Sequence, residues 1–318
     1  MARALLSAGC RVRALARPET GPARSSTPAS RALENVEIVY GDLTNAGALA
    51  RGMSGCRYLV HCAALYSFSP RDRAQIMRVN VAGTAALLDA AHTARVERAV
   101  VTSSSATVGP SHNGRLATER DLADGDHESA YHRSKLLQER AAMAARIPTV
   151  LLLPTTPIGP GDAKPTPTGK LVLDFARGRI FARPPGTGGL NVVAVEDVAN
   201  AHVAALQLGR ARERYLIGGE NLTFEQLWQE LSEVTGQPVP RWKIPYGAAV
   251  ALGYIDEVRC SVTPWKTPIV PLEGVRMSRD TMHVDYSKAA AELRYRPSSA
   301  REALARAVAW YREHGYVA

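Results

Sequence analysis

Tyr131 and Lys135 combine two side-chain types and a spacing that suit proton transfer. In a helix, residues four apart lie on one face, so the phenol and the ammonium would be neighbours. A free tyrosine has a pKa near ~10, and a nearby ammonium favours the phenolate and lowers that pKa. The pair therefore predicts an acid–base site for a substrate hydroxyl or carbonyl oxygen, provided that a helix carries it.

The segment before this pair strengthens a spacing that many helices contain by chance. Val100 and Val101 form an apolar run that leads into a row of hydroxyl side chains, residues 102–105. A serine at the carboxyl end of such a strand can hydrogen-bond the same substrate oxygen as the tyrosine. The residues thus favour a set of serine, tyrosine and lysine.

The first half of the chain alternates apolar β-branched runs with helical patterns, which is typical of parallel strands joined by helices. Runs such as 150–153 are apolar throughout, which fits a sheet covered on both faces. We expect strands at residues 11–16, 36–40, 58–62, 99–102 and 149–153, and helices at 27–34, 45–53, 71–94 and 128–145.

The pattern changes after Pro154, where proline and glycine become frequent. Helices are expected at 195–208, 224–235 and 300–314, and proline-rich loops at 238–245 and 263–272. We therefore expect a doubly wound parallel-sheet domain over residues 1–160. Residues 161–318 should form mainly a smaller α+β substrate lobe, with some segments returning to the first domain.

The composition argues against several classes of protein. The net charge is +9, but the arginines are spread along the chain, which does not favour a nucleic-acid partner. The cysteines show no Cys-x-x-Cys spacing and the histidines form no ligand pair, so we expect no metal site. No apolar run could span a bilayer and no signal peptide is recognised, so a cytoplasmic protein with a small-molecule substrate is expected.

Several motifs occur in the order found in the extended short-chain dehydrogenase/reductases, and the sequence resembles that family. The resemblance implies a Rossmann-like fold and hydride transfer between NAD(P) and the carbon of a secondary alcohol or ketone. The motifs are Gly-Asp-Leu at 41–43, His-Cys-Ala-Ala at 61–64, Asn-Val-Ala-Gly-Thr at 80–84, Thr-Ser-Ser at 102–104, Gly-Pro at 109–110, the loop 154–160 and Val-Ala-Val-Glu-Asp-Val-Ala at 193–199.

Within that superfamily, segments 214–223, 271–277 and 307–311 resemble the dihydroflavonol 4-reductase-like branch and the hopanoid-associated sugar epimerases. This likeness implies a hopanoid-linked sugar or a bulky apolar ketone as the substrate. Reductases and epimerases share the serine, tyrosine and lysine, so both activities stay open. A sugar dehydratase is less expected, because no acidic pair follows the strand 99–102.

The resemblance assigns the catalytic roles to Ser104, Tyr131 and Lys135, with Ser105 as the alternative serine. Tyr66, Ser67, Phe68, Tyr246 and Tyr254 would help to shape the substrate pocket. The residues expected to bind the cofactor are Arg17, Arg24, Asp42, Leu43, Cys62, Ala63, Ala64, Tyr131, Lys135, Pro154 and Thr155.

The end of the expected strand 11–16 bears on the choice of cofactor. An acidic residue there would bind the ribose hydroxyl of NAD, whereas arginine suits the extra phosphate of NADP. The strand leads into Arg17 and Pro18, with Arg24 downstream and no acid at its tip. NADP is therefore favoured, and NAD is the alternative.

The sequence departs from the family at its front. The glycine-rich turn that binds a pyrophosphate, and the strand before it, are not found, and residues 1–9 resemble the later part of the first helix. We expect a start site placed too late, by about 20 residues. The alternative is a non-catalytic or crippled dinucleotide-binding sensor. Helices 71–94 and 128–145 form a dimer contact in many relatives, so a homodimer is also expected.

Overall fold

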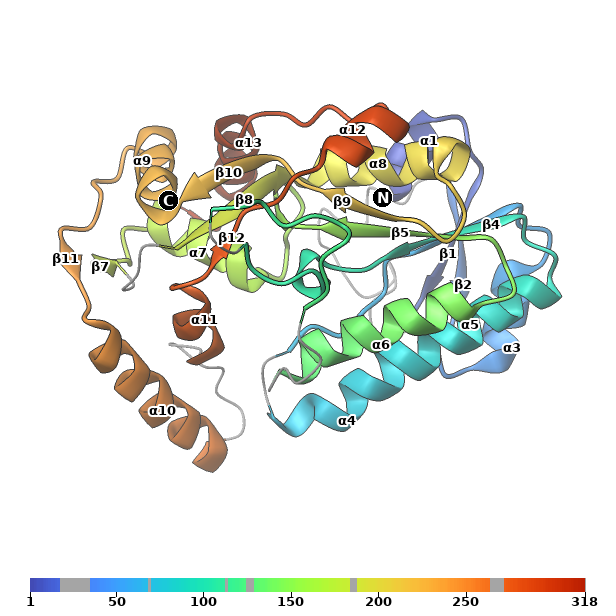
Figure 1. Ribbon diagram of the computed structural model, residues 1–318, viewed down its shortest axis with the longest axis horizontal. Helices are drawn as coiled ribbons and strands as arrows, with labels where there is room; N and C mark the ends of the chain where they lie inside the picture. Colours follow the sequence, from blue (N-terminus) through green and yellow to red (C-terminus); the bar gives the residue numbers. More distant parts are fainter. Residues whose placement is uncertain are drawn as a thin grey trace.

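A parallel sheet in the order β3–β4–β5–β9 forms the centre of the protein, seen in a computed structural model (Figure 1). The structure describes residues 1–17, 35–67, 70–111, 114–123, 129–183, 188–263 and 272–317. The expected helix 27–34 and Arg24 lie outside these residues, as does most of the loop 263–272. The four strands are β3 (Tyr58–His61), β4 (Arg98–Thr102), β5 (Thr149–Pro154) and β9 (Arg214–Ile217).

Helices cover both faces of this sheet, which confirms the doubly wound α/β class (Figure 1). Two further parallel strands, β1 (Val12–Ala16) and β2 (Val36–Tyr40), pair with each other as a separate two-stranded sheet. On one side lie α3 (Ala46–Met53), α5 (Gly83–Thr93) and α6 (Ala130–Ala144), and on the other α1 (Ala2–Ser7), α8 (Val195–Leu208) and α12 (Ser287–Glu292).

Strand β5 is the centre of the apolar core, because all six of its residues are buried. Alternate residues of a strand point to opposite faces. Leu151 and Leu153 accordingly pack in one cluster with residues of α5, such as Leu87. Val150 and Leu152 pack in a second cluster with residues of α8, such as Ala205. A strand covered on both faces explains the unbroken apolar run in the sequence.

Two glycines of the quoted motifs are explained by close packing between motifs. A Cβ atom on Gly41 would lie 2.2 Å from the Cβ of Ala48, so α3 could not approach the end of β2. A Cβ atom on Gly83 would lie 2.8 Å from the Cβ of Leu43. The Gly-Asp-Leu turn and the Asn-Val-Ala-Gly-Thr segment thus pack directly on each other, and Leu43 is buried in the core.

The expected helix 71–94 is not continuous. It is divided into η2 (Pro70–Asp72), α4 (Arg73–Ile76), η3 (Met77–Ala82), which has a wider π-type turn, and α5. Periodicity could not reveal this division, because the apolar spacing is nearly the same in both kinds of helix. Widened turns of this kind often occur at functional sites.

The second half of the chain builds a mixed sheet around β8 (Gly189–Ala194), and it also supplies β9 to the first sheet. Helices α8, α9 (Phe224–Thr235) and α13 (Ala300–Glu313) confirm the sequence prediction, whereas α7 (Pro167–Ala176) and α10 (Tyr246–Val262) were missed. The remaining elements are β6 (Thr156–Ile158), β7 (Ala182–Arg183), β10 (Glu220–Thr223), β11 (Trp242–Lys243), β12 (Thr281–Met282), η4 (Ser105–Thr107) and α11 (Leu272–Met277).

A charged loop closes the outer edge of β9. The Glu119 carboxylate accepts a hydrogen bond from the Leu216 amide at 2.8 Å, and Arg214 donates to the Glu119 carbonyl at 2.7 Å. Such cover protects an edge strand from pairing with other chains.

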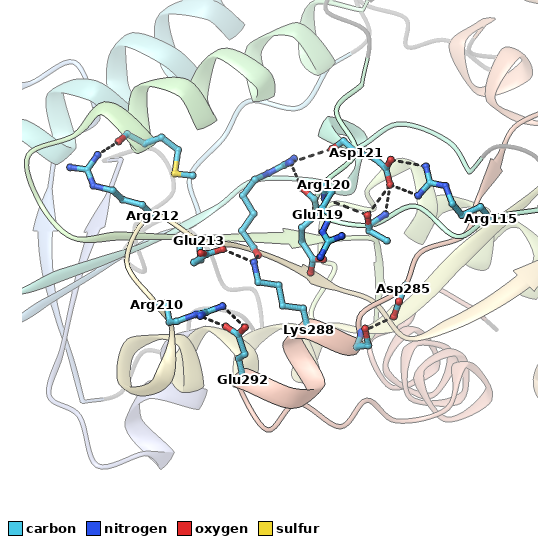
Figure 2. A pocket seen from close by; sticks show the side chains of 14 residues that line it. Arg115, Glu119, Arg120, Asp121, Arg210, Arg212, Glu213, Asp285, Lys288 and Glu292 are labelled. Atoms are coloured by element: carbon cyan, nitrogen blue, oxygen red, sulfur yellow. Dashed lines mark hydrogen bonds and ion pairs between the residues drawn. The ribbon is translucent and has the colours of Figure 1, made fainter.

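A pocket lies beside β9 and this loop, and its charged side chains mostly pair with each other (Figure 2). These pairs are Arg115–Asp121 at 2.7 Å, Arg210–Glu292 at 2.5 Å and Lys288–Glu213 at 2.7 Å.

Candidate active site

The candidate catalytic residues meet where the carboxyl end of β4 faces the first turns of α6. Ser129 caps this helix, since its hydroxyl accepts a hydrogen bond from the His132 amide at 3.5 Å. The helix therefore begins at residue 130, slightly later than the expected 128. Tyr131 lies in the first turn, while Lys135 lies one turn further on and is only 3% exposed.

Ser104 is the serine that reaches the tyrosine. It precedes η4, and its side chain accepts a hydrogen bond from the Ala106 amide at 3.2 Å. The Ser104 hydroxyl also hydrogen-bonds the Tyr131 phenol, which by itself would lower the phenol's pKa. Ser105, the alternative serine, is buried in the following turn. The geometry thus groups Ser104, rather than Ser105, with Tyr131.

The pKa of Tyr131 moves in the direction opposite to the expectation from sequence. Burial raises it to about 12, and the hydrogen bond from Ser104 offsets only part of this effect. The Lys135 Nζ atom lies 6.0 Å from the centre of the Tyr131 ring, and no lowering of the phenol's pKa by the ammonium is resolved. The expected lowering was therefore wrong for the protein alone, because desolvation outweighs the attraction of the lysine.

The Lys135 ammonium is held by two neutral oxygen atoms. It donates to the Thr102 carbonyl at 3.0 Å and to the Gln138 Oε1 atom at 2.9 Å. An ammonium has three N–H groups, so one has no partner among the described residues. Burial lowers the pKa of Lys135 to about 8, although Cys62 and Glu139 act in the opposite direction. Lys135 can therefore offer one N–H group to a ligand.

A buried histidine supports the strand that carries these groups. The His202 Nδ1 atom donates to the Val198 carbonyl at 2.7 Å, which leaves Nε2 to accept from the Thr102 hydroxyl at 2.6 Å. Burial lowers the pKa of His202 to about 4, so this histidine is neutral at neutral pH. Sequence reasoning missed it, because His202 and Thr102 are far apart in the chain.

Asn80 connects the loop after β3 to the catalytic helix. Its Oδ1 atom accepts from the Leu65 amide at 2.7 Å, and its Nδ2 atom donates to the Ser134 hydroxyl at 2.9 Å. Ser134 in turn donates to the Tyr131 carbonyl at 2.7 Å. The asparagine of the Asn-Val-Ala-Gly-Thr motif thus has a positional role that the motif alone did not explain.

Tyr66 is the expected pocket residue that the structure brings to the site. Its ring is 4.5 Å from the Tyr131 ring in an edge-to-face arrangement, and it is 42% exposed. Tyr246 and Tyr254 lie on α10, which packs on α11 in the second lobe. Phe68 lies outside the described residues. Tyr131 therefore has a partly exposed aromatic neighbour in edge-to-face contact.

Two arginines and an aspartate gather at the carboxyl ends of β1 and β2. Asp42 accepts from the Thr44 hydroxyl at 2.6 Å and from its amide at 2.8 Å, and these bonds lower the pKa of Asp42. Arg17 and Arg78 lower it further by their charge. Arg78, on η3, was missed because only the fold brings it to this strand end. The Leu43 side chain is in the core, which leaves only its backbone for a ligand.

The remaining residues that were expected to contact the cofactor lie at or just after the ends of β3 and β5. Cys62, Ala63 and Ala64 are exposed directly after the buried end of β3. After β5, Pro154 is buried, and the Thr155 hydroxyl donates to the Asn191 Oδ1 atom at 2.7 Å. Ligands of open α/β sheets bind at such strand ends, and Lys135 has an N–H group for a ribose.

Known proteins of related sequence cover the whole chain. The sequence profile of the NAD-dependent epimerase/dehydratase family matches residues 1–218. A dihydroflavonol 4-reductase-like protein of Synechocystis sp. is 38% identical over 327 residues, which is 100% of this chain and 92% of the relative. Sterol demethylase protein B of Methylococcus capsulatus is 33% identical over 321 residues, covering 100% and 95%.

A solved structure gives the same result. The crystal structure of gox2253 superposes with a TM-score of 0.83 and is 34% identical, covering 100% of this chain and 95% of its own.

Within the described residues, no group of histidine, cysteine or acidic side chains could hold a metal ion. None of the helices that the structure describes is long and apolar enough to cross a membrane.

Proposed function

Since this chain belongs to the NAD-dependent epimerase/dehydratase family, an enzyme family of NAD(P)-dependent oxidoreductases and epimerases, we propose that it reduces a ketone to a secondary alcohol. Tyr131 supplies the proton, Ser104 orients the substrate oxygen, and Lys135 holds the cofactor ribose. The contacts among Ser104, Tyr131, Thr102 and Lys135 support these roles.

The observation that carries the proposal is the grouping of Tyr131 with Ser104 after β4 and with the buried Lys135 one turn further along α6, where burial also raises the pKa of Tyr131 to about 12. At pH 7 only about one molecule in 10^5 has the phenolate, so Tyr131 is a proton donor. A bound nicotinamide would supply the hydride to the carbonyl carbon. As that C–H bond forms, the carbonyl π bond breaks, and the oxygen atom takes the proton of Tyr131. The Ser104 hydroxyl can donate to the same oxygen, and it would also donate to the phenolate left behind.

We favour NADP over NAD as the cofactor. Arg17 and Arg78 both lie close enough to Asp42 to lower the pKa of its carboxyl, so the strand end that would face the adenosine carries two cations. A 2′-phosphate would interact favourably with both guanidinium groups. Asp42 is occupied by Thr44, which makes it a weaker partner for the ribose hydroxyls of NAD.

A bulky apolar ketone is the substrate class that we favour. The relatives named above are called a dihydroflavonol reductase-like protein and a sterol demethylase protein, and both names refer to multi-ring molecules. Tyr66 places a partly exposed aromatic ring beside Tyr131. The second candidate is epimerisation of a hopanoid-linked sugar. It would use the same serine, tyrosine and lysine, and it must first oxidise a sugar hydroxyl before the keto intermediate is reduced again.

NADPH consumption with a panel of compounds tests this function. The protein is incubated with NADPH and a sterol ketone, a dihydroflavonol or a nucleotide sugar, and absorbance at 340 nm is followed. We expect stoichiometric NADPH loss with a multi-ring ketone. In a parallel incubation of the sugar with NADP⁺, formation of the epimeric sugar without net production of NADPH would instead establish the epimerase. Tight NADPH binding with no turnover of any compound would establish the non-catalytic, dinucleotide-binding alternative.

A further inference from the structure

Gln138 lies directly behind Lys135 and is completely buried. Its Oε1 atom accepts from the Lys135 ammonium at 2.9 Å, and its Nε2 atom donates to the Thr84 hydroxyl at 3.0 Å. A flipped amide would place its NH₂ group against an ammonium, which is a donor only. The charge of Lys135 therefore fixes the orientation of this amide.

Thr84 and His61 complete the support of the amide. The Thr84 hydroxyl donates to the Asn80 carbonyl at 2.7 Å, so its oxygen accepts from Gln138 and from the His61 Nε2 atom, which is 2.8 Å away. Burial, and then the charge of Lys135, lowers the pKa of His61 to about 3. His61 is consequently a neutral donor, and the whole assembly is fixed by hydrogen bonds between buried groups.

The carboxylate of Glu139, the next residue in the helix, does not contact Lys135 but binds other partners. It pairs with Arg214 at 3.0 Å, and its other oxygen accepts from the Ser103 hydroxyl at 2.5 Å and the Thr107 hydroxyl at 2.6 Å. The acceptor in contact with Lys135 is thus a neutral amide, while the adjacent acid is neutralised by an arginine. A carboxylate in the place of the amide would cancel the lysine charge locally.

We propose that Gln138 is a positioning residue that fixes the Lys135 ammonium for the cofactor without neutralising its charge. This inference rests on the role proposed for Lys135 above. Gln138 and the Thr102 carbonyl hold two N–H groups, and the third is directed to the ligand. Because Gln138 has no charge, it holds the ammonium of Lys135 without cancelling the positive charge that faces the ligand. The other charged or titratable groups that face Lys135 are Cys62, His61, Tyr131 and Glu139.

Titration of Lys135 by NMR tests this role without a substrate. The full chain is labelled with ¹³C-lysine, and the Lys135 signal is assigned with Lys135→Arg. Gln138→Glu keeps the shape and adds a charge, whereas Gln138→Leu removes the acceptor. Thr84→Val removes the hydroxyl that holds the amide. Thr149→Val is the matched control, because Thr149, on β5, also has a buried hydroxyl that is bonded to a backbone carbonyl, that of Ile147 at 3.0 Å.

Gln138→Glu should raise the pKa of Lys135, and Gln138→Leu should lower it. Each variant should change the acid dissociation constant of the Lys135 ammonium by about tenfold. Thr84→Val should lower the pKa by less, and Thr149→Val should leave it unchanged. The dissociation constant for NADPH should stay within about threefold for Gln138→Glu and weaken about tenfold for Gln138→Leu.

An unchanged pKa of Lys135 in folded Gln138→Glu would overturn the positioning role. If Gln138→Leu does not fold, the result for Gln138→Glu decides the test by itself. A purely structural Gln138 would change the stability of these variants and not the pKa of Lys135. Because the titration needs no turnover, a negative result here would leave the proposed ketone reduction standing.

Discussion

The sheet β3–β4–β5–β9 and the β1–β2 pair are both parallel and built from similar residues, yet they are packed very differently. All six residues of β5 are buried, whereas none of the residues of β1 or β2 is. The proposed catalytic side chains belong to the first region, and the candidate adenosine-binding residues Arg17 and Asp42 belong to the second. The comparison indicates that the chemistry is positioned in advance, while the binding end depends more on its ligand.

The difference has a simple cause in the sheet topology. In the described part of the chain, β1 pairs only with β2, and β3 pairs only with β4. Among the described residues, β1 and β3 therefore each have one edge without a neighbouring strand, whereas β4 and β5 have a neighbouring strand at both edges. Helices α6 and α8 cover the two faces of β5. Burial falls from the centre of the larger sheet towards β1, and rigidity should fall with it.

The largest expected effect tests whether the packed region carries the chemistry. Lys135→Met should reduce turnover by about 10^3-fold, because it removes the ammonium that would hold the cofactor ribose in position for hydride transfer. Stability should change little or increase, since a charge is removed from a buried position. Turnover is followed at 340 nm and stability by urea unfolding. Turnover within tenfold of the wild type would place the chemistry elsewhere.

A pair of leucines compares the two regions directly. Leu153 on β5 is completely buried, and Leu15 on β1 is only partly buried. Leu153→Ala should cost about 3 kcal/mol of unfolding free energy, through lost burial and a cavity, and Leu15→Ala about 1 kcal/mol. Urea denaturation measures both. Equal losses would mean that β1 is as well packed as β5 and would remove the basis of the comparison.

Acid should weaken the packed region, because His61 and His202 lie there and β1 and β2 contain no histidine. Burial lowers their pKa values to about 3 and about 4, below the unfolded value of 6.5. The unfolded chain therefore binds more protons below pH 6.5, and stability is lost as the pH falls from there towards 4. At pH 5 each histidine should cost about 2 kcal/mol.

Urea unfolding at pH 7.5 and pH 5 measures this loss in the wild type and in His202→Gln. The variant should lose about 2 kcal/mol less than the wild type over this interval, because glutamine does not titrate. His314→Gln is the control, since His314 lies on the surface end of α13. An equal loss in all three proteins would show that the buried histidines do not set the acid response.

The smallest expected effect concerns the open region. Arg17→Ala should weaken NADPH binding about tenfold and NADH binding hardly at all, through loss of one charge-assisted contact. Arg120→Ala, at an exposed position beside β9, is the control for the loss of a positive charge. Nicotinamide fluorescence gives both dissociation constants. Equal weakening for the two cofactors would remove Arg17 from the 2′-phosphate site.

Elements with a strong local pattern were predictable from sequence. Strand β2 and helices α8 and α9 have the expected bounds, and α9 begins at a capping box formed by Thr223 and Gln226. Helix α10 was missed because glycine and alanine interrupt its apolar pattern. Helix α7 was missed because it begins at Pro167, inside a proline-rich stretch. The division of the helix 71–94 includes the wider turn η3, whose buried residue is the polar Asn80, and apolar spacing does not reveal such a turn.

The candidate site was predictable where one helix carries the residues. The pair Tyr131 and Lys135 follows from helical spacing, whereas the place after a strand indicated only a row of hydroxyls and the family resemblance favoured Ser104 over Ser105. Gln138, Arg78 and His202 could not be selected, since each acts through a partner that only the fold brings near. The pKa of Tyr131 was also mispredicted, because burial cannot be judged from a motif.

Tyr131→Phe tests the central claim most directly. Phenylalanine keeps the ring against Tyr66 and removes only the hydroxyl that would supply the proton. Turnover of a ketone at 340 nm should fall by at least about 10^3-fold, while the dissociation constant for NADPH stays within about threefold of the wild type. Retained turnover, or a loss fully explained by weaker NADPH binding, would contradict the role of Tyr131 as the proton donor.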